Sequence, residues 1–350
     1  MCPDPMTRLP IFKEYPKLKE TVPWIPLGDF PTKVTSLSRI TESLSCKSFW
    51  VKRDSESSSL YGGNKVRKLE FEFGKLMERK SEMILAYGSL GSNFTIAACL
   101  FAKTLDIPTH LILYDTVNTP FVMANFKHNC KMAQNMTRIR SPLSLPYAVS
   151  RELWRHRGKQ VYLMPPGGSS PLSTLGYINA MLELKGQIDD GELPMPDYIF
   201  LPVGTGGTLV GLLIAKVLFN LPVKIIGMAV VDWIITNPVI LKLFIYRSVR
   251  FFNQVAGTHL RASHIFKELH LDYRSLGKGY AHSTDEAKRA KDLLKREENI
   301  ILDETYTAKA MAGAIDIVRT DLKADTNVLF WHSFNSQDNG MTLPSEKPID

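Results

Sequence analysis

The sequence is poor in cysteine, with four residues in 350 and no closely spaced pair. Cys2, Cys46, Cys99 and Cys130 lie far apart, without the CxxC spacing or the neighbouring histidines that structural zinc requires. A disulfide-rich secreted scaffold is disfavoured for the same reason, because such proteins carry many cysteines in a short chain. We therefore expect reduced thiols, no metal and a cytoplasmic location.

A long uninterrupted hydrophobic run is also missing. The first residues contain no apolar stretch of signal-peptide length, which argues against secretion. The most apolar region, 217–252, is interrupted by prolines and charged side chains, so it falls short of the ~20 apolar residues that span a bilayer. We interpret it as a core strand followed by a core helix, and we expect no membrane partner.

The chain has no block of like charge. Its formal net charge is +8, from 43 Lys and Arg against 35 Asp and Glu. The basic residues are scattered among acidic ones, without a basic stretch interleaved with aromatic residues, so no nucleic-acid partner is expected. The surplus positive charge favours the approach of anionic ligands.

What the sequence does contain is an alternation of short apolar, β-rich runs with segments of helical periodicity, which is typical of an α/β protein with parallel sheets. Predicted strands cover 49–53, 83–87, 110–114, 160–164, 198–203, 224–229 and 327–332. Predicted helices cover 66–79, 94–105, 173–185, 209–219, 285–296 and 307–321. These elements suffice for two sheets, and the proline- and glycine-rich segment 165–171 is the best internal boundary.

The segment 61–70 places one lysine between a glycine turn and an amphipathic helix. Gly62 and Gly63 allow a tight turn, and Asn64 is a favourable helix N-cap. Lys65 then occupies the first helical position, where the positive end of the helix dipole disfavours the ammonium form. Such an amine is a better nucleophile and forms Schiff bases with carbonyl compounds such as pyridoxal phosphate. Taken alone, the segment also fits a solvated loop lysine.

Two further glycine-rich turns each join a strand to a helix, at the sheet edge where ligands bind. The turn 204–208, Gly-Thr-Gly-Gly-Thr, offers backbone N–H groups and hydroxyls that suit a phosphate. Leu209 stands where a dinucleotide fingerprint needs glycine, which disfavours a nicotinamide-dependent oxidoreductase, and a P-loop is excluded. The other turn ends in Ser92 and Asn93, which suit a carboxylate or a cofactor ring, although ordinary N-capping also explains them.

Two tyrosines adjoin turn-like segments farther along the chain. Tyr280 follows Gly277-Lys-Gly279, and Tyr306 precedes Thr307. A phenol serves as an acid–base group if a cationic neighbour shifts its pKa down from ~10. Most tyrosines are packing residues, however, so both interpretations stay open on position alone.

In this order and spacing, the motifs resemble the pyridoxal-phosphate-dependent D-cysteine desulfhydrase and 1-aminocyclopropane-1-carboxylate deaminase family, which has the tryptophan-synthase-β-like fold. The resemblance extends from Phe12 to His332. It implies an α/β protein with two open parallel-sheet domains and pyridoxal phosphate in the cleft between them. Residues 1–67 and 177–350 would form the large domain, and residues 68–176 a small inserted one. Folds of this kind are commonly homodimers.

The resemblance also implies roles for individual residues. Lys65 would hold the cofactor as a Schiff base and move the substrate Cα proton. Ser92 would contact the substrate carboxylate, Tyr306 would lie at the reacting side of the substrate, and Tyr280 would support proton transfer. The other expected cofactor contacts are Asn93 at the ring hydroxyl, Gly204, Thr205, Gly206, Gly207 and Thr208 at the phosphate, and Thr307 and Ser333 at the pyridine nitrogen.

The residue after Tyr306 separates two chemistries in the resembled family. Deaminases carry an acid there that pairs with the pyridine nitrogen, whereas desulfhydrases carry threonine, and this chain has Thr307. A hydroxyl stabilises a pyridinium less than a carboxylate does, which favours α,β-elimination over cyclopropane opening. We therefore predict a D-cysteine desulfhydrase-like lyase that acts on a small amino acid and releases pyruvate, ammonia and sulfide. Activity like that of 1-aminocyclopropane-1-carboxylate deaminase is the alternative.

The chain departs from the family pattern at three positions. Phe94 replaces a histidine, and Phe334 and Asn335 replace two glycines that follow His332 and Ser333. Bulkier side chains at these positions predict a narrower pocket, a different substrate, or a catalytically weakened pyridoxal-phosphate-binding protein on the same scaffold.

Overall fold

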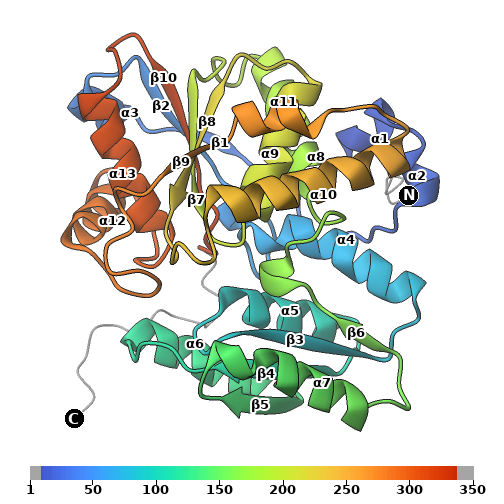
Figure 1. Cartoon of the computed structure of the whole chain (residues 1–350). Helices are drawn as coiled ribbons and strands as arrows, with labels where there is room; N and C mark the ends of the chain where they lie inside the picture. The colour runs from blue at the N-terminus through green and yellow to red at the C-terminus, as the bar shows by residue number, and fades with distance from the viewer. Residues whose placement is uncertain (1–8, 337–350) are drawn as a thin grey trace.

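A computed structural model describes residues 9–336, which form two units, each a sheet covered by helices (Figure 1). The strands are β1 (Val34–Ser36), β2 (Ser48–Lys52), β3 (Met83–Ser89), β4 (Thr109–Tyr114), β5 (Asn135–Ile139), β6 (Val161–Leu163), β7 (Tyr198–Val203), β8 (Lys224–Ala229), β9 (His270–Asp272) and β10 (Asn327–Trp331). The α-helices are α1 (Pro10–Glu14), α2 (Leu18–Thr21), α3 (Ser38–Leu44), α4 (Lys65–Glu78), α5 (Asn93–Thr104), α6 (Pro120–Met132), α7 (Leu145–Arg155), α8 (Leu175–Asp189), α9 (Gly207–Leu218), α10 (Pro238–Ala256), α11 (Ala262–Lys267), α12 (Asp285–Glu298) and α13 (Thr307–Thr320).

The two sheets confirm the predicted α/β class. The larger sheet has the order β1-β2-β10-β7-β8-β9, and the smaller one β5-β4-β3-β6. All pairs of neighbouring strands in the described residues are parallel except β1 with β2. The carboxyl edges of parallel strands are the usual position of a ligand site in this architecture.

Every predicted strand is present, and β7 and β8 have the predicted bounds. The missed strands β1, β5 and β9 are short or lie at sheet edges, and their residues are largely exposed or half-buried. Their side chains therefore do not form the apolar run by which buried parallel strands are identified in a sequence.

The core of the large unit lies on both faces of its sheet. Alternate residues of β7 enter opposite layers: Ile199 packs with α8, α9 and α10, whereas Phe200 packs with α3, α12 and α13. Figure 1 shows these two groups of helices on opposite sides of the sheet. The period of two along a strand is the cause of this division.

Helix α4 connects the two units. Its residues Val66, Leu69 and Phe73 recur at helical spacing and join the core of the small unit, whereas Phe71 joins that of the large unit. The predicted domain boundaries at 67/68 and 176/177 fall within α4 and α8, where the two helices approach closely. A Cβ at Gly176 would lie 2.2 Å from the carbonyl oxygen of Arg67, so only glycine permits this approach.

A buried ionic network anchors the first turn of α4 to neighbouring elements of the large unit. Arg67 donates to Asp54 at 2.8 Å and to Glu183 at 2.8 Å, and Lys52 donates to Glu183 at 2.5 Å. Asp54 also accepts hydrogen bonds from the side chains of Tyr177 and Trp331. The network joins β2, α4, α8 and β10 two residues beyond Lys65.

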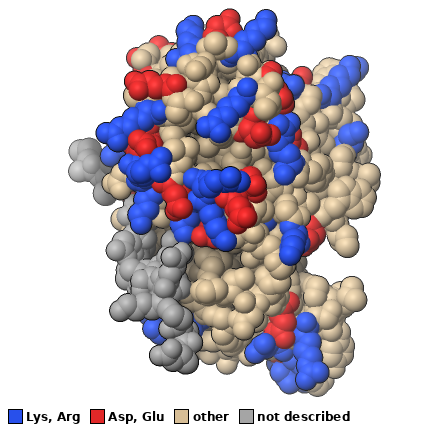
Figure 2. All heavy atoms as spheres, turned by 90° about the vertical axis from the view of Figure 1, so that its left-hand side faces the viewer, with Lys and Arg blue, Asp and Glu red and all other residues tan. Residues whose placement is uncertain are grey.

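The surface mixes charges of both signs. On the face covered by α3 and α12, basic and acidic side chains lie side by side (Figure 2). Pairs such as Arg39 with Glu297 and Lys291 with Glu304 account for part of this pattern. Among residues 9–336, no helix combines the length and apolar character needed to cross a bilayer.

Helix α10 corrects one expectation about burial. The sequence of 217–252 predicts a core strand followed by a core helix, and β8 and α10 are both present. Only one face of α10 is buried, however, and Val239 and Leu243 on the other face are 74% and 60% exposed. Apolar residues on both faces of a helix predict burial on both faces, and the described residues supply a partner for only one.

Candidate active site

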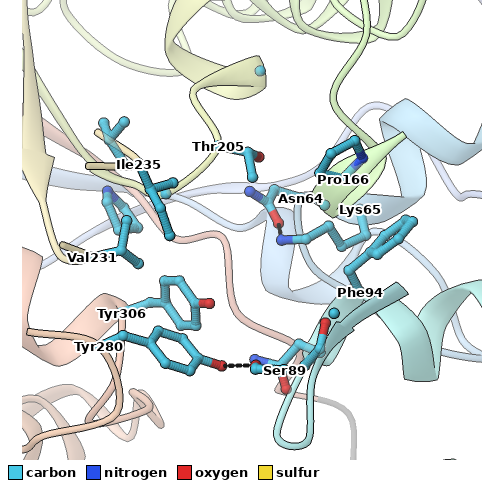
Figure 3. Close-up of a pocket in the computed structure, with 18 of the residues that line it drawn as sticks. Asn64, Lys65, Ser89, Phe94, Pro166, Thr205, Val231, Ile235, Tyr280 and Tyr306 are labelled. Carbon is cyan, nitrogen blue, oxygen red and sulfur yellow. Dashed lines mark hydrogen bonds between the residues drawn. The ribbon is translucent and has the colours of Figure 1, made fainter. Parts of the chain in front are cut away.

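A cavity of about 900 Å³ lies between the two units. Its walls come from the carboxyl ends of β3 and β7 and from the first turns of α4, α5 and α9, together with the loop that carries Tyr280 and the segment 333–335 (Figure 3). The structure brings nearly all predicted site residues to this cavity. They are Lys65, Ser92, Asn93, Gly204, Thr205, Gly206, Gly207, Thr208, Tyr280, Tyr306 and Ser333.

Lys65 is the first residue of α4, as predicted. Its Nζ donates to Asn64 Oδ1 at 2.6 Å, and Asn64 Nδ2 donates to Thr208 Oγ1 at 3.1 Å. Asn64 occupies the N-cap position, but its side chain makes no capping bond, contrary to expectation. It instead holds the lysine amine beside the turn that opens α9.

Desolvation lowers the pKa of Lys65 to about 8, and the negative charge of Asp303 opposes this shift. The predicted direction is confirmed, although burial among protein atoms is the principal cause. A lysine with this pKa is partly neutral at physiological pH and is therefore a better nucleophile than an exposed lysine.

The turn that opens α9 has a backbone geometry that suits an anion. Gly206 has a left-handed conformation with φ of 85°, and α9 begins at Gly207. A Cβ at Gly206 would lie 2.3 Å from Leu241 Cδ2, and one at Gly207 would lie 2.6 Å from Ser169 Oγ. Glycine therefore leaves the N–H groups at this helix N-terminus accessible to an anion.

Lys68 and Ser169 also belong to this site, although sequence reasoning missed both. Lys68 Nζ donates to Ser169 Oγ at 3.1 Å, and Ser169 Oγ is 2.7 Å from Thr205 Oγ1. Desolvation, reinforced by the charge of Lys65, lowers the pKa of Lys68 well below its usual value. The spacing of three residues from Lys65 was the available signal, because it places both lysines on one helix face.

Ser92 and Asn93 open α5 on the opposite wall. Ser92 Oγ accepts from the backbone N–H of Thr95 at 3.4 Å, a long capping bond. Asn93 Oδ1 accepts from Asn125 Nδ2 at 2.8 Å. The N-capping interpretation is thus correct for Ser92, and its hydroxyl lies at the helix N-terminus, where a carboxylate is favoured.

Tyr280 and Tyr306 lie together, with ring centroids 5.8 Å apart in an edge-to-face arrangement. Ser89 Oγ on the small unit donates to the Tyr280 hydroxyl at 3.0 Å (Figure 3), so this contact joins the two units. Desolvation raises the pKa of both tyrosines, so the condition set for acid–base use, a pKa shifted down by a cationic neighbour, is not met in the described structure. Both phenols therefore stay protonated at physiological pH, where they can donate a hydrogen bond but cannot act as bases.

Thr307 is the predicted site residue that does not reach the cavity wall. It is fully buried, and its hydroxyl donates to Asp303 Oδ1 at 2.7 Å. Asp303 also accepts from the backbone N–H groups of Tyr306 and Thr307 at the start of α13, and it lines the cavity itself. Sequence spacing could not show that the Thr307 hydroxyl is hydrogen-bonded to Asp303.

The segment that departs from the family pattern packs against the glycine turn. Asn335 Oδ1 accepts from the Gly62 backbone N–H at 2.8 Å, and the Ser333 carbonyl accepts from that of Asn64 at 2.9 Å. A Cβ at Gly63 would lie 2.8 Å from the Ser333 carbonyl oxygen. Asn335 thus supports the turn that carries the site lysine.

These residues fit pyridoxal phosphate, the group that the resemblance implies. A phosphate at the start of α9 would meet backbone N–H groups, the hydroxyls of Thr205 and Thr208, and the amine of Lys68. Asn64 links the amine of Lys65 to this position, because it accepts a hydrogen bond from Lys65 and donates one to Thr208. Both requirements of the cofactor, an anion site and an adjacent nucleophilic amine, are met within one cavity.

Known proteins resemble this chain over nearly its whole length. The family model described as pyridoxal-phosphate dependent enzyme matches residues 25–333. A D-cysteine desulfhydrase from Klebsiella pneumoniae is 26% identical over 321 residues, covering 89% of this chain and 93% of the relative. A Thermotoga maritima protein, provisionally named 1-aminocyclopropane-1-carboxylate deaminase, is 29% identical over 305 residues, covering 87% and 93%. A crystal structure described as that of an ACC deaminase homologue has a TM-score of 0.77 at 26% identity, covering 95% of this chain and 96% of its own.

Proposed function

The chain belongs to the family of pyridoxal-phosphate dependent enzymes, and from this premise we propose that it catalyses α,β-elimination on a small amino acid, D-cysteine or a close analogue. The balanced reaction converts D-cysteine and water into pyruvate, ammonia and hydrogen sulfide. The principal support is the desolvated amine of Lys65, which lies between a phosphate-binding turn and two neutral tyrosines.

Pyridoxal phosphate supplies, when bound, an aldehyde that condenses with amines and a ring that withdraws electrons from the substrate Cα. We assign its phosphate to the turn 204–208 and Lys68, and its ring hydroxyl to Asn93. Because the hydroxyl of Thr307 is engaged by Asp303, we assign the pyridine nitrogen to Ser333. A serine hydroxyl there supports elimination better than chemistry that needs a fixed positive charge on the ring.

Lys65 is the proposed base. Its pKa of about 8 leaves the amine able to take the proton from the substrate Cα near neutral pH, and Asn64 orients the nitrogen. Ser92 and the N-terminus of α5 bind the substrate carboxylate. The Cβ–S bond then breaks with its electron pair on sulfur, which takes up the proton that Lys65 removed from Cα, while Tyr306, supported by Tyr280, donates a hydrogen bond to the departing sulfur.

Keto-acid release from a panel of amino acids tests this proposal. We expect pyruvate from D-cysteine with the wild-type enzyme and with Lys75→Ala, a variant at a partly exposed position of the same helix. Lys65→Ala should lose both activity and the visible absorbance of the bound cofactor. Release of 2-oxobutyrate from 1-aminocyclopropane-1-carboxylate without pyruvate from D-cysteine would favour the deaminase alternative. Cofactor binding without release of any keto acid would identify a catalytically weakened protein.

We further propose a homodimer formed through the α10 surface, which we define as Trp233, Ile234, Val239, Leu243 and Tyr246. All five are more than half exposed. Exposed apolar residues concentrated in one short segment are typical of a protein–protein interface, and a two-fold axis would pair this surface with itself. Ile234 also lines the cavity, so this interface would lie beside the active site.

Light scattering coupled to gel filtration tests the dimer. Leu243→Glu should shift the protein to a monomer, because two buried carboxylates would face each other across the axis. Met77→Glu, at a 50% exposed position on α4, is the matched control and should leave the dimer intact. A wild-type protein that is monomeric at micromolar concentration would contradict the assignment.

Two further predictions remain proposals. We assign residues 1–67 and 177–350 to the large domain and 68–176 to the small one, since every strand of the smaller sheet lies between 83 and 163. We also propose a cytoplasmic location. Cys46, Cys99 and Cys130 are free thiols, which suits a reducing compartment, whereas Cys2 lies outside the described residues.

A further inference from the structure

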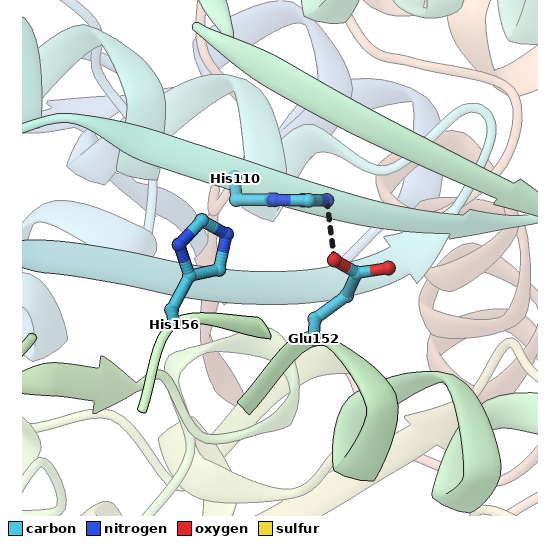
Figure 4. Close-up of side chains that lie close together, drawn as sticks. All are labelled: His110, Glu152 and His156. Carbon is cyan, nitrogen blue, oxygen red and sulfur yellow. Dashed lines mark ion pairs between the residues drawn. The ribbon is translucent and has the colours of Figure 1, made fainter. Parts of the chain in front are cut away.

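Three side chains that commonly bind metal ions meet on the face of the smaller sheet covered by α7 (Figure 4). His110 comes from β4, Glu152 from α7, and His156 directly follows that helix. One ligand atom of each residue lies within 4.8 Å of the others. Glu152 and His156 are four residues apart, so both point to the same side of α7, toward the strand that carries His110.

The cluster is largely shielded from water. The side chain of Glu152 is 1% exposed, and that of His110 is 7% exposed. His110 Nε2 lies 3.0 Å from Thr137 Oγ1 and 3.9 Å from Glu152 Oε2. His110 Nδ1 is buried without a hydrogen-bond partner in the described part of the chain. A buried polar atom without a partner costs free energy unless something else binds it.

We propose that His110, Glu152 and His156 bind one divalent transition-metal ion, Zn²⁺ or an ion of similar preference, with water as a fourth ligand. Two imidazoles and one carboxylate are an established zinc ligand set. In a tetrahedral site with bonds of about 2.0–2.2 Å, neighbouring ligand atoms lie about 3.3–3.6 Å apart. The three residues therefore have to approach by an ångström or so, which the half-buried His156 at the end of α7 permits.

Two arginines determine how tightly the ion is held. Arg151 and Arg155 donate to Glu152 Oε1 at 2.9 Å and 3.1 Å, so this oxygen is already engaged. Glu152 Oε2 faces His110 and lies 3.4 Å from Arg155. The Arg155 side chain is 54% exposed and can turn into water, but its positive charge opposes a cation at Oε2. Removal of Arg155 should therefore tighten metal binding.

The site lies away from the active-site cavity. Tyr114, at the end of β4, lines that cavity, and His110 precedes it by four residues, or about 13 Å at ~3.3 Å per residue of strand. An ion at this position would connect the end of α7 to the sheet. The proposed role is thus to stabilise the small unit rather than to take part in the reaction.

Calorimetric titration of the cofactor-loaded protein with Zn²⁺ tests the proposal, with the thermal unfolding midpoint as a second measurement. We expect one ion per chain and a higher unfolding midpoint in its presence, because binding to the folded state alone stabilises it. His156→Ala should weaken binding by about tenfold or more. His264→Ala, which removes an exposed histidine on α11, should not change it.

The Arg155→Gln variant distinguishes Zn²⁺ binding at this site from adventitious binding elsewhere on the protein. The variant keeps all three proposed ligands and should bind Zn²⁺ more tightly than the wild type does. Co²⁺ bound in place of Zn²⁺ should show the visible ligand-field bands of a four-coordinate ion, and His156→Ala should abolish them. Equal affinity of wild type and His156→Ala, or no binding by the wild type, would overturn the proposal.

Discussion

The chemistry of the site lysine is decided by its immediate surroundings. Lys65 is half-buried at the cavity wall, and Asn64 holds its nitrogen at 2.6 Å. Desolvation favours the neutral amine, and the carboxylate of Asp303 limits how far the pKa falls. Lys68, three residues along, experiences desolvation together with the charge of Lys65. One helix face therefore carries two amines, and we propose that Lys65 is the nucleophile and Lys68 an anion ligand.

The pH dependence of Lys65 reactivity follows from this environment. In protein freed of cofactor, the rate of acylation of Lys65 should rise through a midpoint near pH 8, because only the neutral amine reacts. Mass spectrometry after brief labelling at a series of pH values measures this rate, with the exposed Lys80 in the same sample as a reference. A midpoint above pH 10 would show that the amine is solvated.

At the scale of elements, the ends of helices position the site. Helices α4, α5, α9 and α13 all begin at or beside the cavity, and the first residues of each contribute to its wall or to the contacts behind it. The turn before α9 needs a left-handed residue at Gly206, and Leu241 of α10 closes over it. The strand-to-helix connections after β3 and β7, one from each sheet, thus meet at the cavity together with the starts of α4 and α13.

Substitution of Gly206 tests the α9 turn. Gly206→Ala should cost about 1–2 kcal/mol in unfolding free energy from the left-handed conformation, with an added contribution from the contact with Leu241. It should also weaken cofactor binding, since the N–H groups would shift. Gly191→Ala is the matched control, because Gly191 has φ of 77° and no atom within 4 Å of its added Cβ. The control should lose similar stability yet keep the affinity for cofactor, measured by absorbance titration.

At the scale of the whole molecule, buried contacts of α4 fix the position of the two units relative to each other. Helix α4 contributes apolar residues to both cores. The ionic network of Lys52, Asp54, Arg67 and Glu183 joins it to β2 and α8. The position of Lys65 relative to the α9 turn therefore depends on residues far apart in the sequence.

Loss of one member of this network should unfold the protein readily. Arg67→Met leaves Asp54 and Glu183 buried without their principal partner and should cost about 3–5 kcal/mol, measured by urea unfolding at pH 7. Arg274→Met, which removes an arginine that contacts three carboxylates at the partly exposed surface, should cost less than about 1 kcal/mol per lost pair.

Acid should remove the same contribution from the wild type. In the folded state the pKa values of Asp54 and Glu183 are lowered, with Arg67 as the main favourable partner against desolvation. The unfolded chain therefore binds more protons as pH falls below its carboxyl pKa values of about 4, and stability decreases there. Above that range the contribution is fully present. In the Arg67→Met variant, the urea midpoint should accordingly fall less than in the wild type as the pH is lowered.

The sequence by itself determined the α/β class, the buried strands, the glycine turns and the family, because each rests on local patterns: alternation of elements, apolar runs, and residue types at fixed spacing. It also identified Lys65 as the lysine to explain. These features can be predicted without knowing which segments are in contact in the folded chain.

Only the tertiary structure decided how those residues are used. It engaged the Thr307 hydroxyl with Asp303, added Lys68 and Ser169 to the anion site, raised rather than lowered the pKa of both tyrosines, and exposed one face of α10. It also gathered His110, Glu152 and His156 from separate elements. Desolvation and side-chain partners arise from contacts between distant segments, so no local pattern contains them.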